Sequence, residues 1–322
     1  MFKIGLVGTW HVHFSGYAKE VAKHEGCVIT RLWDPDEAKS REEAEKFGCE
    51  FFDDYDAFLS GGEVEGIVVA SSTDLHPELL IKAANAGKHI FTEKVLAFTL
   101  EDTLAIKEAI VKSGKQFCIS FPWRSRPDFL WLKQALDEKL LGDVTYCRMR
   151  NAHNGASAGW LPQTFFDPKT CGGGAMMDLG AHGMYLLNWL MGKPKTVISM
   201  FTNVMVQSVE DNAVSVFSYE NGAIGVSETG FVAQENPFSL EVVGTKGTIF
   251  LGGHAGKAVF NVGNGWETPE LPEAKPSPIV MWMDGVMGGT EIPYTIDDAV
   301  ALTETMEAAY KAAHQNVTYT LT

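Results

Sequence analysis

The sequence predicts an α/β fold with two domains, the first built on a doubly wound parallel sheet and the second on a large, mostly antiparallel open sheet. Apolar, strand-like runs alternate with helical segments through the first third of the chain. From residue 195 to residue 262, strand-like runs instead follow one another across short turns. A chain of 322 residues is longer than a single hydrophobic core usually supports. We expect the domains to cover residues 1–122 and 123–322.

The first domain should contain βαβ units, because its apolar runs are short and bounded by turn residues. We expect strands at residues 3–8, 28–33, 51–52, 66–70, 89–92 and 117–121. We expect helices at residues 13–24, 36–47, 55–59, 77–87 and 99–113. Gly48 is placed to end the second of these helices, and Thr99 is placed to cap the start of the last.

The second domain is expected to open with a helix at residues 128–140 and a strand at residues 144–151. A run of three glycines at residues 172–174 then leads into a helix that ends near residue 191. The following strands are predicted at residues 197–204, 213–219, 223–231, 238–243 and 248–251. After a loop rich in proline and glycine, we expect a closing helix and a closing strand at residues 297–314 and 317–321.

Composition excludes several classes of function. The net charge of −15 argues against a nucleic-acid surface or a basic membrane patch. No uncharged apolar run approaches the ~20 residues that a membrane-spanning helix needs, and the chain opens on a strand, so we expect no signal peptide. The five cysteines form no C-x-x-C pair, which favours reduced thiols in the cytoplasm.

The first βα turn carries a partial dinucleotide-binding pattern. Only the first glycine of G-x-G-x-x-G is present, while Trp10 and His13 replace the other two, so an ordinary turn is the alternative. Asp34 ends the next strand where an acid can accept hydrogen bonds from a ribose 2′-OH and repel a 2′-phosphate, which favours NAD over NADP. Asp34 also fits a simple turn, and Lys39 or Arg41 would be able to reach a phosphate. The cofactor candidates in the turn are Gly8, Thr9, Trp10, His11 and Val12.

The pair His11-x-His13 invites comparison with a metal site. No acid or cysteine lies nearby in the sequence to complete it, so we expect no metal. A histidine N–H facing a phosphate at the start of a helix is the better functional hypothesis.

Three later segments carry a family resemblance. They are the runs Ser72–Pro77 (S-T-D-L-H-P), Ala86–Ala97 with its A-G-K-H-x-x-x-E-K pattern, and Gly172–His182 with G-G-G-x-x-x-D-x-G-x-H. In this order they resemble the glucose–fructose oxidoreductase, inositol dehydrogenase and rhizopine catabolism (Gfo/Idh/MocA) family over nearly the whole chain. Val95 departs from the family, which usually has proline after the lysine.

The resemblance implies a Rossmann domain that binds NAD(P), followed by an α/β domain whose open sheet often forms a dimer interface. It implies oxidation or reduction at a sugar or cyclitol carbon, and a homodimer or homotetramer. Lys94, Asp178 and His182 match the family's catalytic lysine, substrate-side acid and proton-transfer histidine. The residues expected beside the cofactor, besides those of the first turn and Asp34, are Ser71, Ser72, His76, Glu93 and Lys94.

These residue types suit the oxidation of an alcohol. His182 has an ordinary pKa near neutrality and can take the hydroxyl proton, and Asp178 lies four residues earlier, on the same face of a helix. Lys94 follows a parallel strand at the edge where ligands bind, and its ammonium can stabilise charge on the oxygen. We expect Lys94 and His182 to act on one alcohol oxygen. The substrate-binding candidates are Arg124, His153, Trp160 and Tyr185.

Plainer interpretations stay open for these residues. The Asp178–His182 pair would also suit a surface hydrogen bond, the glycine run a flexible linker, and Tyr185 with Trp189 the core. The leading functional hypothesis is hydride transfer between NAD(P) and a secondary hydroxyl of a sugar, cyclitol or related polyol. The alternatives are an NAD-dependent glycosidase that oxidises its sugar only transiently, and a non-catalytic dinucleotide-binding homologue.

Overall fold

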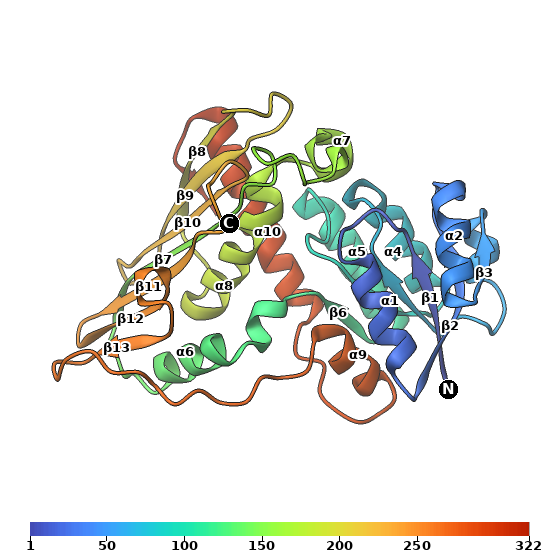
Figure 1. Cartoon of the computed structure of the whole chain (residues 1–322), viewed down its shortest axis with the longest axis horizontal. Helices are drawn as coiled ribbons and strands as arrows, with labels where there is room; N and C mark the ends of the chain where they lie inside the picture. Colours follow the sequence, from blue (N-terminus) through green and yellow to red (C-terminus); the bar gives the residue numbers. More distant parts are fainter. Residues whose placement is uncertain (322) are drawn as a thin grey trace. The chain divides into compact units, whose positions relative to one another are not determined.

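The computed structural model describes residues 1–321, which divide into two compact units (Figure 1). The first unit contains Met1–Phe121 and Pro276–Val300, and the second contains Pro122–Lys275 and the chain from Ala301 onward. The first unit is therefore discontinuous. A single boundary after residue 122 does not describe the return of residues 276–300 to the first unit.

A parallel sheet forms the centre of the first unit. Its strand order within the described residues is β3-β2-β1-β4-β5-β6, and each neighbouring pair is parallel. The strands are β1 (Phe2–Val7), β2 (Cys27–Trp33), β3 (Glu50–Phe52), β4 (Gly66–Val69), β5 (His89–Thr92) and β6 (Phe117–Ile119). The order reverses between β1 and β4, and ligands of doubly wound sheets bind at such a switch point, outside the carboxyl ends of the strands. The predicted doubly wound fold is confirmed.

The five α-helices within residues 1–121 lie close to their predicted bounds, and a short 3₁₀ turn that was not predicted precedes the fourth. They are α1 (Phe14–Lys23), α2 (Glu37–Phe47), α3 (Tyr55–Leu59), the 3₁₀ turn η1 (Thr73–Leu75), α4 (His76–Asn85) and α5 (Leu100–Ser113). Gly48 ends α2 with a left-handed φ of 65°. The Thr99 hydroxyl accepts the Asp102 N–H at 3.1 Å and caps α5.

The returning segment adds α9 (Pro278–Val286) to the first unit, where it contacts α1, β5 and β6. The Trp282 indole of α9 packs against Phe2 and Phe91, with ring centroids 5.6 and 5.9 Å apart. Ile119 donates its N–H to the Tyr294 carbonyl at 3.2 Å. The sequence analysis predicts no helix here, because one short apolar stretch after a long loop has no neighbouring strands to mark it as part of a βαβ unit.

The second unit is built on a sheet of order β13-β12-β11-β7-β10-β9-β8-β14. Its strands are β7 (Val144–Ala152), β8 (Thr196–Thr202), β9 (Asn212–Ser218), β10 (Ile224–Gly230), β11 (Phe238–Gly244), β12 (Gly247–Gly252), β13 (Val259–Asn261) and β14 (Tyr319–Thr320). Among the described strands, β7 and β10 pair in parallel and the other neighbours are antiparallel. This confirms the predicted, mostly antiparallel sheet.

Helical segments of the second unit place the residues of interest. They are η2 (Pro122–Ser125), α6 (Pro127–Asp137), η3 (Gln163–Phe166), α7 (Pro168–Cys171), the π-helical turn η4 (Met176–Gly180), α8 (Ala181–Met191) and η5 (Gly253–Ala255), with α10 (Ile296–Gln315) beginning in the first unit. α8 lies close against β7 and β10. A side chain at Gly183 would collide with the Ser227 hydroxyl, so glycine permits this approach.

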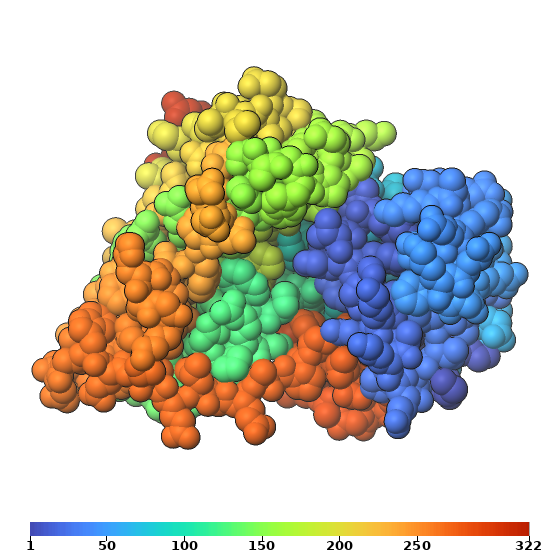
Figure 2. All heavy atoms as spheres, viewed as in Figure 1, coloured from blue at the N-terminus to red at the C-terminus, as the bar shows by residue number. Residues whose placement is uncertain are grey.

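Surface features of the second unit are also clear. Ile198 and Met200 of β8 are 49% and 68% exposed, so part of the sheet lies open. The segment between β13 and α9 is exposed along most of its length, and Figure 2 shows it in orange on the surface. Within residues 1–321, no helix combines the length and the apolar character needed to cross a membrane.

We predict that Trp282→Ala will lower the free energy of unfolding by about 3–5 kcal/mol, because the indole is 0% exposed and its removal leaves a cavity. Denaturant titration followed by circular dichroism measures this change. Trp266→Ala is the control, since that indole is 55% exposed and should cost much less. An equal loss in both variants would contradict the assignment of α9 to the core of the first unit.

Candidate active site

The β1–α1 turn holds its shape through Gly8. This residue has a left-handed φ of 81°, and a Cβ there would collide with the backbone of Ser71. The close approach brings the ends of β1 and β4 together, which explains why the first glycine of the pattern is present. The buried Ser71 hydroxyl has no hydrogen-bond partner among the described residues.

Several amides of this turn are already used within the protein. The Thr9 N–H donates to the Asp34 carboxylate, and the His11 N–H donates to the Ala70 carbonyl at 2.9 Å. The Lys39 ammonium donates to the Thr9 carbonyl at 2.8 Å. A dinucleotide phosphate therefore cannot take the Thr9 or His11 amide without breaking these bonds.

Asp34 lies at the end of β2, as predicted, and is buried. Besides the Thr9 bond, its Oδ1 accepts the Asp36 N–H at 2.7 Å, which is the turn role considered above. Each carboxylate oxygen can accept a second hydrogen bond, so the ribose contact stays a prediction. Arg41 pairs with Glu37 at 2.7 Å on α2, and its guanidinium lies 4.6 Å from the centroid of the Phe51 ring of β3.

Glu93 and Lys94 directly follow β5, and both are buried. The Glu93 N–H donates to the Val69 carbonyl at 3.1 Å, as the His11 N–H does to Ala70, so both residues converge on the end of β4. The Lys94 N–H donates back to Glu93 Oε2 at 2.9 Å. The Lys94–Val95 peptide bond is cis.

Two side chains also contact the Glu93 carboxylate, one from the residue directly before α1 and one from α1 itself. His13 Nδ1 lies 2.6 Å from Glu93 Oε1, and the Tyr17 hydroxyl donates to the same oxygen. Burial alone would raise the pKa of the Glu93 carboxyl, but the charges of His11 and His13, the His13 hydrogen bond and Lys94 outweigh it and hold the pKa well below its usual value. Burial, and then the Glu93 charge, raise the pKa of Tyr17 well above its usual value. Tyr17 therefore remains a hydrogen-bond donor, a role that the sequence analysis missed.

His76 begins α4 and is fully packed. Its Nδ1 donates to the Leu96 carbonyl at 3.1 Å, which fixes the segment that follows Lys94. Burial lowers the pKa of His76, so the ring stays neutral. Ser72, also predicted near the cofactor, is buried directly before η1.

In the second unit, His182 near the start of α8 is held by two aromatic residues. Its ring stacks on Trp123 with centroids 4.9 Å apart and planes 14° apart. Its Nδ1 lies 3.0 Å from the Tyr185 hydroxyl, whose oxygen accepts the backbone N–H of Trp123 at 3.3 Å. Tyr185, predicted to contact the substrate, is buried, and its hydroxyl instead contacts His182. Trp123 was not predicted as a site residue, because it belongs to a short 3₁₀ turn without periodicity.

Asp178 lies in the π-helical turn η4, not in a continuous α-helix. The predicted pairing of Asp178 with His182 therefore stays a prediction, because hydrogen bonds in a π-helix join residues five apart and the spacing of an α-helix does not apply directly. Burial lowers the pKa of His153, while the Asp178 charge opposes that shift and so couples to this ring. His153 stacks on Phe231 and lies 4.7 Å from Trp160 between ring centroids, so two predicted substrate residues form one cluster.

Arg124 points its charge at an aromatic ring. Its guanidinium lies 4.9 Å from the centroid of the Trp189 ring, a cation–π contact. This places one predicted substrate-binding residue against a tryptophan that the sequence also allows in the core.

The glycine run at residues 172–174 is tightly packed, which excludes the flexible-linker interpretation. A Cβ at Gly173 would collide with the Tyr310 hydroxyl, and one at Gly174 would collide with the Glu210 carbonyl. Glu210 Oε1 accepts the N–H groups of Gly174 and Met176 at 2.8 and 3.0 Å, and the Tyr310 hydroxyl at 2.6 Å. Glu210, which the sequence analysis missed, therefore fixes the entry into η4 and α8.

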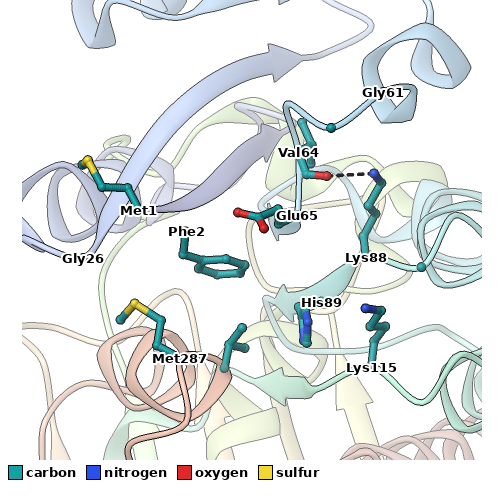
Figure 3. A pocket seen from close by; sticks show the side chains of 13 residues that line it. Met1, Phe2, Gly26, Gly61, Val64, Glu65, Lys88, His89, Lys115 and Met287 are labelled. Atoms are coloured by element: carbon teal, nitrogen blue, oxygen red, sulfur yellow. Dashed lines mark hydrogen bonds between the residues drawn. The ribbon is translucent and has the colours of Figure 1, made fainter.

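A separate hollow of about 740 Å³ lies at the opposite, amino edge of the first sheet (Figure 3). Phe2, Glu65 and His89 line it, and the Lys88 ammonium donates to the Val64 carbonyl at 2.7 Å. None of the predicted site residues lines this hollow. This hollow is therefore separate from the predicted site.

Two family models match the chain. Residues 2–121 match the model described as an oxidoreductase family with an NAD-binding Rossmann fold, and residues 129–250 match the GFO/IDH/MocA C-terminal domain. The chain belongs to the Gfo/Idh/MocA oxidoreductase family. Its first unit is an NAD-binding Rossmann domain, and the partnerless Ser71 hydroxyl beside Gly8 fits a cofactor at the carboxyl edge.

Relatives of this Gfo/Idh/MocA oxidoreductase include two inositol dehydrogenases. The scyllo-inositol 2-dehydrogenase (NAD(+)) of Bacillus subtilis is 26% identical, with 77% of this chain and 72% of the relative covered. The myo-inositol 2-dehydrogenase of Thermotoga maritima is 27% identical with the same coverage. Levoglucosan dehydrogenase in complex with NADH shares the fold, with a TM-score of 0.84 at 20% identity over 100% of this chain and 99% of that one. These findings do not favour the glycosidase or the non-catalytic alternative.

We predict that Glu210→Ala will lower the free energy of unfolding by about 3 kcal/mol, because two buried amides and a buried hydroxyl lose a charged acceptor. Urea titration measures the loss. Glu220→Ala removes an exposed acid that pairs with Lys195, and it should change stability little. Equal stability of the Glu210 variant and the wild type would contradict the anchoring role.

Proposed function

We propose that this oxidoreductase transfers a hydride between NAD and a carbon that bears a secondary hydroxyl in a sugar, cyclitol or related polyol. The observation that carries the proposal is a buried lysine, Lys94, held directly after β5 next to the switch point of an NAD-binding sheet. The names of the two inositol dehydrogenases support a polyol substrate. Asp34 at the end of β2 supports NAD rather than NADP.

In this proposal Lys94 acts on the substrate oxygen. When bound, NAD supplies the hydride acceptor, and the protein supplies position and charge. The Lys94 ammonium would donate a hydrogen bond to that oxygen and stabilise negative charge as the proton leaves. The Glu93 carboxylate holds the Lys94 backbone and adds a compensating negative charge.

His182 is assigned the proton-transfer role. A general base needs one imidazole nitrogen without a proton. Because Nδ1 faces the Tyr185 oxygen, the base form requires Nδ1–H to donate to that oxygen and leaves Nε2 to take the proton. The stacked Trp123 ring restricts rotation of the imidazole, which favours a fixed direction of attack.

The remaining polar residues of the second unit would recognise the substrate. Trp160 is exposed and lies beside His153, so its ring can stack on a sugar face while the imidazole binds a hydroxyl. The Trp160 indole N–H donates to Asn154 at 2.8 Å, which orients the ring. Asp178 and Arg124 are proposed to bind further hydroxyl groups.

Assembly and location are also proposals. The exposed apolar residues of β8 support a homodimer or homotetramer formed through the open sheet. The five cysteines of the described residues form no disulfide with one another, which supports a cytoplasmic location.

The direct test is a screen of sugars and polyols with NAD and with NADP, followed by absorbance of the reduced cofactor and mass of the product. We expect reduced cofactor to form in equal amount with a keto product. Cleavage of a glycoside without reduced cofactor, or the absence of any cofactor binding by calorimetry, would contradict the proposal.

We predict that Lys94→Ala and His182→Ala will each lower turnover by about 10²–10⁴-fold, because one removes the ammonium that stabilises charge on the oxygen and the other removes the group that takes the proton. NAD affinity, measured by calorimetry, should remain close to that of the wild type. Lys112→Ala and His254→Ala are the matched controls, since both side chains are exposed. Turnover near the wild-type value in either site variant would rule out its assigned role.

Asp34→Ala is predicted to shift the cofactor preference toward NADP, because the carboxylate that repels a 2′-phosphate is lost. The measurement is the ratio of kcat/KM with NAD to that with NADP. A thermal melt of the variant reports separately on the turn bonds that Asp34 makes to Thr9 and Asp36. An unchanged ratio in a folded variant would contradict the ribose contact and restrict Asp34 to its role in the turn.

A further inference from the structure

Three side chains at the carboxyl edge of the first sheet form a cluster with the donor set of a metal site. They are His11, His13 and Glu93, and one ligand atom of each lies within 4.8 Å of the others. The sequence argument against a metal, that no acid lies near the histidine pair, is wrong for the folded chain. We propose that this cluster binds one divalent transition-metal ion of the Zn²⁺ class.

The fold brings these residues together through the end of β4. Ala70 accepts the His11 N–H and Val69 accepts the Glu93 N–H, so the β1–α1 turn and the residue after β5 are fixed to adjacent carbonyls. Within the turn, the His13 N–H donates to His11 Nδ1 at 3.2 Å, and the two rings lie 4.7 Å apart between centroids. The cluster is therefore set by backbone geometry, not by the chance meeting of flexible side chains.

The donor atoms lie at separations that a metal ion can bridge. His13 Nδ1 and His11 Nδ1 are 2.6 and 3.6 Å from Glu93 Oε1. The His11 Nδ1 lone pair accepts the His13 N–H at 3.2 Å, so a metal ion at this atom would replace that hydrogen bond. Two ligands of a tetrahedral zinc ion, each about 2.0 Å from the metal, lie roughly 3.3 Å apart. The two observed separations lie on either side of that value. Two imidazoles and one carboxylate are a donor set that first-row divalent metals accept, with a further position open to water.

Supporting contacts orient the carboxylate as they do in metal proteins. The Tyr17 hydroxyl donates to Glu93 Oε1 and also lies 2.8 Å from the Ser120 hydroxyl. The Lys94 N–H holds the other oxygen, Oε2, at 2.9 Å. Hydrogen bonds of this kind fix ligand direction and raise metal affinity.

The cluster is also accessible from solvent on one side. Glu93 and His11 are buried, whereas 47% of the His13 side chain is exposed. A metal ion can enter past the His13 ring and replace the proton that His13 and Glu93 share. The low-dielectric surroundings on the Glu93 side then strengthen the attraction between the carboxylate and the cation.

The test uses the full chain, stripped with a chelator and then titrated with Zn²⁺ without cofactor or substrate. Bound metal is counted by elemental analysis after dialysis, and affinity is measured by competition with a chromophoric chelator. We expect one equivalent per chain in the wild type. His13→Ala should bind more than about 100-fold more weakly, since even the loss of an outer-shell partner costs 10–100-fold. Glu93→Gln provides a second variant of nearly the same shape.

His254→Ala is the control, because it removes an exposed histidine outside the cluster and should retain one equivalent. Circular dichroism establishes that each variant is folded. Failure of the wild type to bind Zn²⁺, or equal affinity in the wild type and either cluster variant, would overturn the proposal. Because no cofactor or substrate is present, this result is independent of the redox assay.

Discussion

The buried carboxylate of Glu93 joins the segments that form the carboxyl edge of the first unit. It accepts from Tyr17 of α1, lies 2.6 Å from His13 at the start of that helix, and accepts the backbone N–H of Lys94. A carboxylate in such a place is costly to bury unless its oxygens are paired, and here hydrogen bonds and nearby positive charge supply that pairing. The Glu93 carboxylate therefore positions the Lys94 backbone and at the same time accepts a hydrogen bond from α1.

The second unit uses a comparable device. Glu210 accepts two amides of the glycine run and the hydroxyl of Tyr310, and so fixes the turn η4 from which α8 continues to His182. The stacked Trp123 ring then restricts rotation of the His182 imidazole. Each proposed catalytic side chain is thus oriented by contacts within its own unit, most of them buried, which is the preorganisation that acid–base chemistry requires.

The sequence predicts the regular parts of the fold because they depend on local patterns. Short apolar runs such as 66–70 mark the buried parallel strands, and the caps at Gly48 and Thr99 are local chemistry. The return of α9 and the π-helical turn at Asp178 depend on packing that no short pattern records. Glu93 and His13 are 80 residues apart, so only the folded sheet shows that the histidine pair has an acidic neighbour. Tyr17 lies four residues after His13 on one helical face, a spacing that would have been a usable signal.

We infer that the carboxyl edge of the first unit binds NAD with its reactive ring beside Lys94. A crystal structure of the full chain with NAD tests this most directly. We expect electron density for the pyrophosphate over the turn at residues 8–13 and for the nicotinamide in contact with the Lys94 ammonium. Density that directs the nicotinamide away from Lys94, or no cofactor at saturating concentration, would rule out this site.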